Sequence, residues 1–154
     1  MKKILLLLLF FPLLSFGQSV ITNANIAQLV NDWDTDEQFA IEFLHGNISD
    51  WDVSNVTDMS YLFYYETYFT NEDLSAWDVS NVTNMSHMFR GTNSFNGNIS
   101  SWDVSNVTNM SYMFESTNSF NQDIGSWDVS NVTNMSYFFM NNDSFNQDIG
   151  DWDV

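Results

Sequence analysis

The sequence predicts an α/β repeat solenoid that is closed by helices at its N-terminal end, and three observations support this prediction. The seven residues WDVSNVT occur four times without change. The tryptophans that open these copies are 26, 25 and 25 residues apart, and a fixed period of this length is typical of stacked-repeat architectures. Apolar residues recur at matching places in every copy, so each copy can form part of its neighbour's core.

The chain starts with a segment typical of a secretory signal peptide. Lys2 and Lys3 give it a positive start, residues 4–14 are apolar, and residues 15–17 fit a cleavage site of small residues. The apolar stretch is too short for a membrane span, and no other stretch is apolar enough to cross a bilayer. We therefore expect residues 1–17 to be removed and the protein to be secreted or held at the cell surface.

Residues 18–50 are predicted to form an N-terminal helical cap. Apolar residues spaced at i, i+3, i+4 and i+7 predict an amphipathic helix; they are Ile26, Leu29, Val30 and Trp33. Thr35 and Gln38 fit a capping box for a second helix. The apolar face of that helix would carry Phe39, Phe43 and Leu44.

Residues 51–154 hold four repeats and the start of a fifth. In the third repeat, Met110, Met113 and Phe114 have the spacing of a short helix that Thr108 could cap. The DIGSWDV motif of residues 123–129 predicts a short strand in a parallel ladder, and NSFN predicts a turn. Eight core positions are expected: Trp102, Val104, Val107, Met110, Met113, Phe114, Phe120 and Ile124. The fifth copy stops after WDV, so we expect this sequence to be a piece of a longer protein with a larger number of repeats. The alternative is a protein that is released with an exposed end.

Charge and composition exclude several partners. Removal of Lys2 and Lys3 changes the formal charge from −17 to −19 and leaves Arg90 as the single cation against 20 carboxylates. Such a surface repels nucleic acid and anionic membranes, so we expect neither as a partner. The chain has no cysteine, which excludes a disulfide framework and a lipid-modified cysteine.

The repeat resembles that of the BspA-like leucine-rich-repeat surface proteins of bacteria, in the branch with a WDVSNVTNMSYMF…FNQDIGS unit. The resemblance runs from about Ile26 to Val154. It implies leucine-rich-repeat-like coils with short parallel strands and short helices, a secreted or cell-surface location, adhesion through protein contacts, and no catalytic centre. Members of that family are commonly anchored to the cell, whereas this chain lacks the cysteine of a lipid anchor.

Two polar residue types recur in register. Stacked aspartates about 5 Å apart would repel one another, so we expect each to accept backbone N–H groups in an Asx turn. Bound Ca²⁺ and simple solvation are the alternatives for these residues: Asp52, Asp78, Asp103, Asp128 and Asp153. An asparagine ladder that satisfies backbone groups is expected from Asn55, Asn81, Asn106 and Asn131.

No residue is predicted to be catalytic or to bind a cofactor or a structural metal. His45 and His87 lack the partner spacing of a metal site. The carboxylates repeat in register, whereas an active site needs one asymmetric group of residues. We therefore expect the protein not to be an enzyme; activity on a glycan panel would indicate otherwise.

The segments that differ between repeats predict a partner-contact set. Variable turns of repeat proteins often gather on the binding face, and Tyr and Arg dominate interface energies. The predicted contact residues are Tyr64, Tyr65, Tyr68 and Arg90. The alternative is that this turn merely tolerates variation and that Arg90 balances nearby acidic groups.

Together these features predict a non-catalytic binding or adhesion module that contacts protein or glycan on another cell or matrix. One alternative is an ice-binding surface, since Thr57, Thr83, Thr108 and Thr133 form a regular row. Another is a structural surface protein that assembles with itself end to end.

Overall fold

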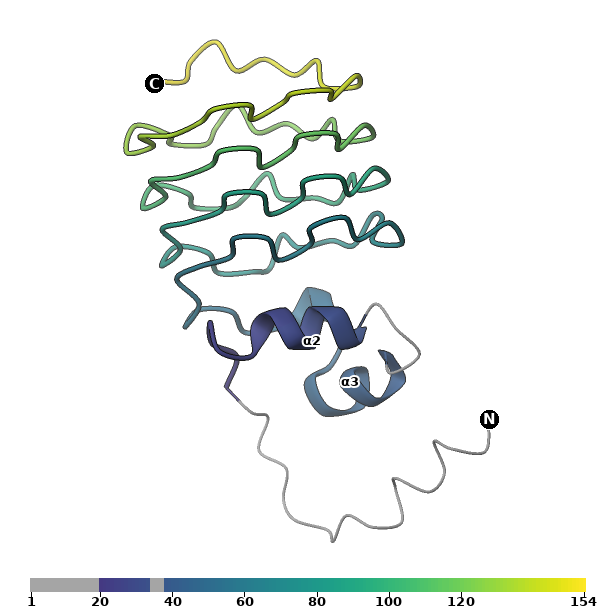
Figure 1. The fold of residues 1–154 in the computed structure, drawn as a ribbon. Helices are drawn as coiled ribbons and strands as arrows, with labels where there is room; N and C mark the ends of the chain where they lie inside the picture. The colour runs from purple at the N-terminus through teal and green to yellow at the C-terminus, as the bar shows by residue number, and fades with distance from the viewer. Residues whose placement is uncertain (1–19, 34–37) are drawn as a thin grey trace, which may run out of the picture.

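The computed structural model describes residues 20–33 and 38–154. The predicted signal peptide and the capping-box residue Thr35 lie outside these ranges. Figure 1 shows a helical N-terminal segment followed by successive coils of irregular backbone, each lying on the one before. The predicted boundary near residue 50 stays a prediction, although regular helix in the described part is confined to residues before Trp51.

The helical segment contains α2 (Ile26–Trp33), α3 (Gln38–His45) and the 3-10 helix η1 (Ile48–Asp50). The predicted helix over residues 26–33 is confirmed as α2, and its four periodic apolar residues are buried. In α3 the prediction for Leu44 is wrong, because this side chain is exposed. The side chains of Phe39 and Phe43 lie outside what the structure describes.

The predicted α/β repeat solenoid of leucine-rich-repeat-like coils, with short parallel strands and short helices, is wrong. Within the described repeats there is no helix and no extended strand, and parallel pairing is limited to isolated bridges. These bridges join Asp58 to Asn84, Asn84 to Asn109, and Asn109 to Asn134. The coils consist of turns, bends and irregular backbone.

Left-handed residues explain why the predicted helix fails. The residue in the middle of each predicted helical turn has a φ of 59–60°, and a left-handed residue ends a right-handed helix. This position carries Tyr61, His87, Tyr112 and Tyr137. The predicted strand fails because its N–H groups close local turns, as in the bonds from Trp102 N to Ile99 O and from Trp127 N to Ile124 O.

Backbone hydrogen bonds join each coil to the next in a repeated pattern that includes both forward and backward donors. Four alternate N–H groups of one coil donate to carbonyls of the following coil at 2.8–3.1 Å. At the first junction the donors are Met59, Tyr61, Phe63 and Tyr65, and the acceptors are Asn84, Ser86, Met88 and Arg90. The N–H groups between them close i to i+3 turns, for example Leu62 N to Met59 O. The backbone is therefore satisfied without a regular sheet.

The core is a set of aromatic columns that run along the stack. Tryptophans of neighbouring repeats stack with ring centroids 6.3–6.5 Å apart, from Trp51 to Trp127. From Trp77 to Trp152, each indole N–H of these repeats also donates to a backbone carbonyl 28–29 residues earlier, as Trp102 Nε1 does to Leu74 O at 2.9 Å. Two phenylalanine columns lie beside the tryptophans, and their rings stack on each other within each coil. The ring centroids of Phe114 and Phe120, for example, are 4.0 Å apart. All eight core positions predicted for the third repeat are buried.

Helix α2 and the loop before it cover the first coil. Asn23 Oδ1 accepts from Thr57 N at 2.8 Å, and Asn23 Nδ2 donates to Thr57 Oγ1 at 2.8 Å. In later coils the equivalent N–H, such as that of Thr83, donates to the carbonyl of the preceding threonine. The Asn23 amide thus accepts the hydrogen bond that a carbonyl of the preceding coil accepts in later repeats. Trp33 of α2 also packs edge-on against Phe69 of the first coil.

Neither α-helix in residues 20–33 and 38–154 combines the length and the apolar character that crossing a bilayer requires.

Candidate functional site: a tyrosine patch beside an aromatic column

Exposed aromatic side chains occur close together in the sequence of the first coil, between residues 61 and 68. Tyr61, Tyr64, Tyr65 and Tyr68 are 53%, 39%, 53% and 82% exposed. The rings of Tyr61 and Tyr64 pack edge to face with their centroids 5.4 Å apart, and the rings of Tyr64 and Tyr65 do so with their centroids 4.6 Å apart. We call these four residues the tyrosine patch. Exposed aromatic groups gathered in this way are typical of interaction surfaces.

An aromatic column continues from the tyrosine patch along the stack. It consists of the four left-handed residues Tyr61, His87, Tyr112 and Tyr137. Neighbouring rings lie nearly parallel, with centroids 4.4–4.7 Å apart. The rings cover each other's faces, so the column presents mainly ring edges and polar atoms to solvent.

A second left-handed position carries the patch residue Tyr65 and the equivalent residues Gly91, Ser116 and Asn141. The ring of Tyr65 lies directly on Gly91: a β-carbon at Gly91 would be only 2.6 Å from Tyr65 Cδ1. Glycine at this one repeat therefore leaves the space that the ring of Tyr65 fills. The left-handed backbone costs about 1–2 kcal/mol at a non-glycine residue, so coil-to-coil contacts must offset it.

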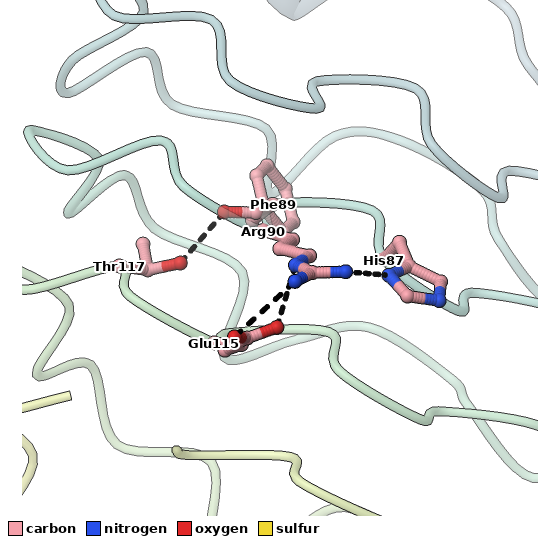
Figure 2. A network of polar contacts seen from close by, with 5 residues as sticks. All are labelled: His87, Phe89, Arg90, Glu115 and Thr117. Atoms are coloured by element: carbon pink, nitrogen blue, oxygen red, sulfur yellow. Dashed lines mark hydrogen bonds and ion pairs between the residues drawn. The ribbon is translucent and has the colours of Figure 1, made fainter. Parts of the chain in front are cut away.

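Arg90 lies at the centre of a polar network (Figure 2). Its guanidinium forms an ion pair with Glu115, with 2.5 Å between Nε and Oε2, and Nη2 donates to Oε1 at 3.3 Å. Nη1 lies 3.3 Å from His87 Nδ1. The guanidinium carbon is also 5.8 Å from the ring centroid of Tyr64 and 5.1 Å from that of Tyr112. Arg90 is thus held between two carboxylate oxygens, an imidazole and two rings, with 27% of its side chain exposed.

The surroundings of His87 favour its neutral form. Burial lowers the pKa of His87, the neighbouring Arg90 charge lowers it further, and Glu115 opposes both with a smaller effect. Because arginine can only donate, the contact requires Nδ1 to be an acceptor and places the imidazole proton on Nε2. Protonation of His87 would remove this acceptor and bring two cations together.

The structure places the predicted contact residues as follows. Tyr64 and Tyr65 touch each other, and Arg90 lies near Tyr64. Tyr68 is the most exposed of the set, and the structure gives it no ring contact among the described residues. Sequence reasoning missed Tyr61 and His87. The signal was present, since these residues occupy equivalent positions one repeat apart.

The repeated aspartates form the predicted Asx turns. In four repeats the carboxylate accepts from the N–H of the serine two residues later at 3.1 Å and from its hydroxyl at 2.6–2.7 Å. The serine hydroxyl, followed by the serine N–H, lowers the pKa of Asp52, Asp78 and Asp128. Within the described residues no group of three or more His, Asp or Glu side chains is arranged to hold a metal ion.

The asparagines and threonines that recur in register also form ladders, in which their side chains satisfy backbone groups. The amide nitrogens of Asn81, Asn106 and Asn131 each donate to a serine carbonyl of the preceding coil at 2.8–2.9 Å, as the predicted asparagine ladder requires. The threonine hydroxyls donate to the carbonyl of the preceding threonine, as Thr108 Oγ1 does to Thr83 O at 3.1 Å. Thr108 therefore caps no helix.

Comparison with known proteins gives a family. The sequence profile of a family described as "Mycoplasma protein of unknown function, DUF285" matches residues 19–152. The chain belongs to the DUF285 family. No curated protein and no solved structure matches the chain.

The DUF285 match spans the helical segment and all four repeats, so the tyrosine patch lies within the family's own region. The family description assigns no function. The resemblance to BspA-like surface proteins stays a prediction.

Proposed function

We propose that this protein is an exported, non-catalytic binding or adhesion module whose tyrosine patch contacts a partner on another cell or matrix. The observation that carries the proposal is the presence of four exposed tyrosines within residues 61–68 of an otherwise periodic molecule. Large aromatic residues supply much of the binding energy at protein interfaces. The signal-like N-terminus and the resemblance to bacterial surface proteins also support it.

The network around Arg90 gives the patch a rigid base. Tyr64 packs against Tyr61 and Tyr65, and the guanidinium that lies over its ring is held by Glu115. Side chains that are already ordered lose less conformational entropy on binding. In this proposal Arg90 positions the tyrosines, and the tyrosines make the contact.

The experiment is retention of beads coated with the purified protein on a printed array of extracellular proteins and glycans. The test variant changes Tyr65 and Tyr68 to Ala, and the matched control is Tyr137→Ala, which removes an equally exposed tyrosine from the fourth repeat. We expect the test variant to lose retention on every spot that holds the wild type. Equal retention of the wild type and the test variant would refute the proposal.

One observation favours ice binding as a second candidate. The exposed threonines form a column in which each hydroxyl has a fixed orientation, set by the bond to the preceding threonine. A regular column of this kind could order water. A gap between melting and freezing temperatures that Thr108→Val reduces would support this function, and the absence of a gap would exclude it.

A further inference from the structure

The chain contains one example of the contact that the tyrosine patch is suited to make. The guanidinium of Arg90 lies over the rings of Tyr64 and Tyr112, with its carbon 5.8 and 5.1 Å from their centroids. Aromatic faces carry negative potential, and cations within about 6 Å of the ring centroid are attracted to them. Within the described residues, tyrosine faces on this surface thus accept a cation where Arg90 supplies one.

The other tyrosines of the patch have no cation of this kind. Arg90 is the one Lys or Arg in residues 20–154, and its charge is neutralised by Glu115. Tyr68 is 82% exposed, and Tyr65 is covered by Gly91 on one side while half of its surface remains open to solvent. The patch therefore combines open ring surface with a shortage of positive charge.

The charge of the whole chain points to the same kind of partner. Its formal charge is −17, with 20 carboxylates against three basic residues. Such a field accelerates association with cationic partners and disfavours anionic ones.

We propose that the tyrosine patch binds a basic segment of a partner protein, with lysine or arginine side chains lying on the rings of Tyr65 and Tyr68. This inference rests on the proposed binding function and names its partner class. The alkyl stems of these side chains would cover the rings while the charged ends face the acidic surface. A neutral glycan could also stack on open rings, but it would gain nothing from the chain's charge.

The test is fluorescence anisotropy with three labelled peptides of equal length, in which every third residue is lysine, glutamine or glutamate. The wild-type protein should bind the lysine peptide and neither of the others. Two cation–π contacts correspond to about a tenfold effect, so Tyr65→Ala/Tyr68→Ala should weaken binding about tenfold. Tyr137→Ala should leave the affinity within about twofold, since it changes neither the patch nor the formal charge.

A second variant protects the test against a folding defect. Tyr68→Ala changes only the most exposed ring, so its thermal unfolding should match the wild type while binding still weakens several-fold. If neither variant weakens binding of the lysine peptide, the peptide is held by net charge alone and the inference is wrong. If the array retention depends on Tyr65 and Tyr68 but the lysine peptide does not bind, the binding function stands and the basic partner is excluded. Patch-dependent retention on neutral glycan spots alone would likewise overturn it.

Discussion

The ring of Tyr65 lies against Gly91. A β-carbon added at Gly91 would be only 2.6 Å from Tyr65 Cδ1, which is closer than van der Waals contact allows. The two residues hold equivalent positions in consecutive repeats, and both have positive φ. In the later repeats this position carries Ser116 and Asn141, which do have a β-carbon. The ring of Tyr65 is therefore what makes Gly91 necessary.

This relationship predicts strong coupling between Gly91 and Tyr65. Gly91→Ala should lower the free energy of unfolding by about 2 kcal/mol, because left-handed strain adds to the displacement of the ring. In a Tyr65→Ala background, Gly91→Ala should lower the free energy of unfolding only by the cost of the left-handed backbone. Urea unfolding of the four proteins measures the difference. Equal costs in the two backgrounds would show that the ring and Gly91 are not in contact in solution.

The Arg90–Glu115 pair predicts a second coupling. Arg90→Met should destabilise the protein by about 1–2 kcal/mol, because it leaves the Glu115 carboxylate poorly solvated and without its cation. Methionine is the residue at the equivalent position in the fourth repeat, Met140, so the backbone accepts it. The value is moderate because about a quarter of the Arg90 side chain is exposed.

The control for that prediction is the double variant Arg90→Met/Glu115→Met. Removing both charges should restore most of the stability. If the double variant is as unstable as the sum of the single variants, Arg90 contributes by packing alone and the ion pair adds nothing.

The indole hydrogen bonds predict a position-dependent cost for Trp→Phe. Trp102 is buried, and its N–H donates to Leu74 O, so Trp102→Phe should cost about 2–4 kcal/mol from the unsatisfied carbonyl and the cavity. Trp152 makes the same type of bond to Ile124 O but is only partly buried. Trp152→Phe should therefore cost clearly less in thermal unfolding, and a similar cost at both sites would contradict the role assigned to burial.

His87 predicts a dependence of stability on pH. Its pKa is lower in the folded protein than the usual value of about 6.5, so the unfolded chain binds more protons just below that pH. The contribution of neutral His87 is complete above about pH 6.5 and is lost as the pH falls towards the folded pKa. His87→Tyr places the residue of the other three repeats at this position and removes the effect.

Unfolding temperatures of the wild type and His87→Tyr, measured from pH 8 down to about pH 5, test this sign. The difference between the two proteins should shift in favour of the variant as the pH falls. A constant difference would show that protonation of His87 is not linked to folding. The aspartates do not affect this comparison, since both proteins carry them and their pKa values are lowered.

Local patterns predicted some parts of the fold well. The spacing of the apolar residues was sufficient to predict α2, because a helix with one buried face has a distinct period. The Asx turns followed from aspartate placed two residues before serine. The pair formed by Arg90 and Glu115 could also have been found, since these residues are 25 apart and thus equivalent in neighbouring repeats.

The backbone of the repeats could not be predicted in the same way. Met110, Met113 and Phe114 have helical spacing, yet Tyr112 between them is left-handed and its N–H bonds to Ser136 O of the next coil. Residue type gave no sign of this, because tyrosine rarely adopts positive φ. The energy that holds it there comes from stacking between coils, which appears only when the repeats are placed side by side.

The repeated pattern of hydrogen bonds between coils has a consequence for how such proteins change in length. Every junction uses equivalent donors and acceptors, and every aromatic column continues through it. A gene rearrangement that gains or loses one whole repeat would create no new kind of junction. The first repeat shows the tolerance for smaller changes, since its additional residue lies between Phe69 and Leu74 while the columns on both sides stay in step. Surface residues such as the tyrosine patch can therefore differ between repeats while the junctions between coils stay the same.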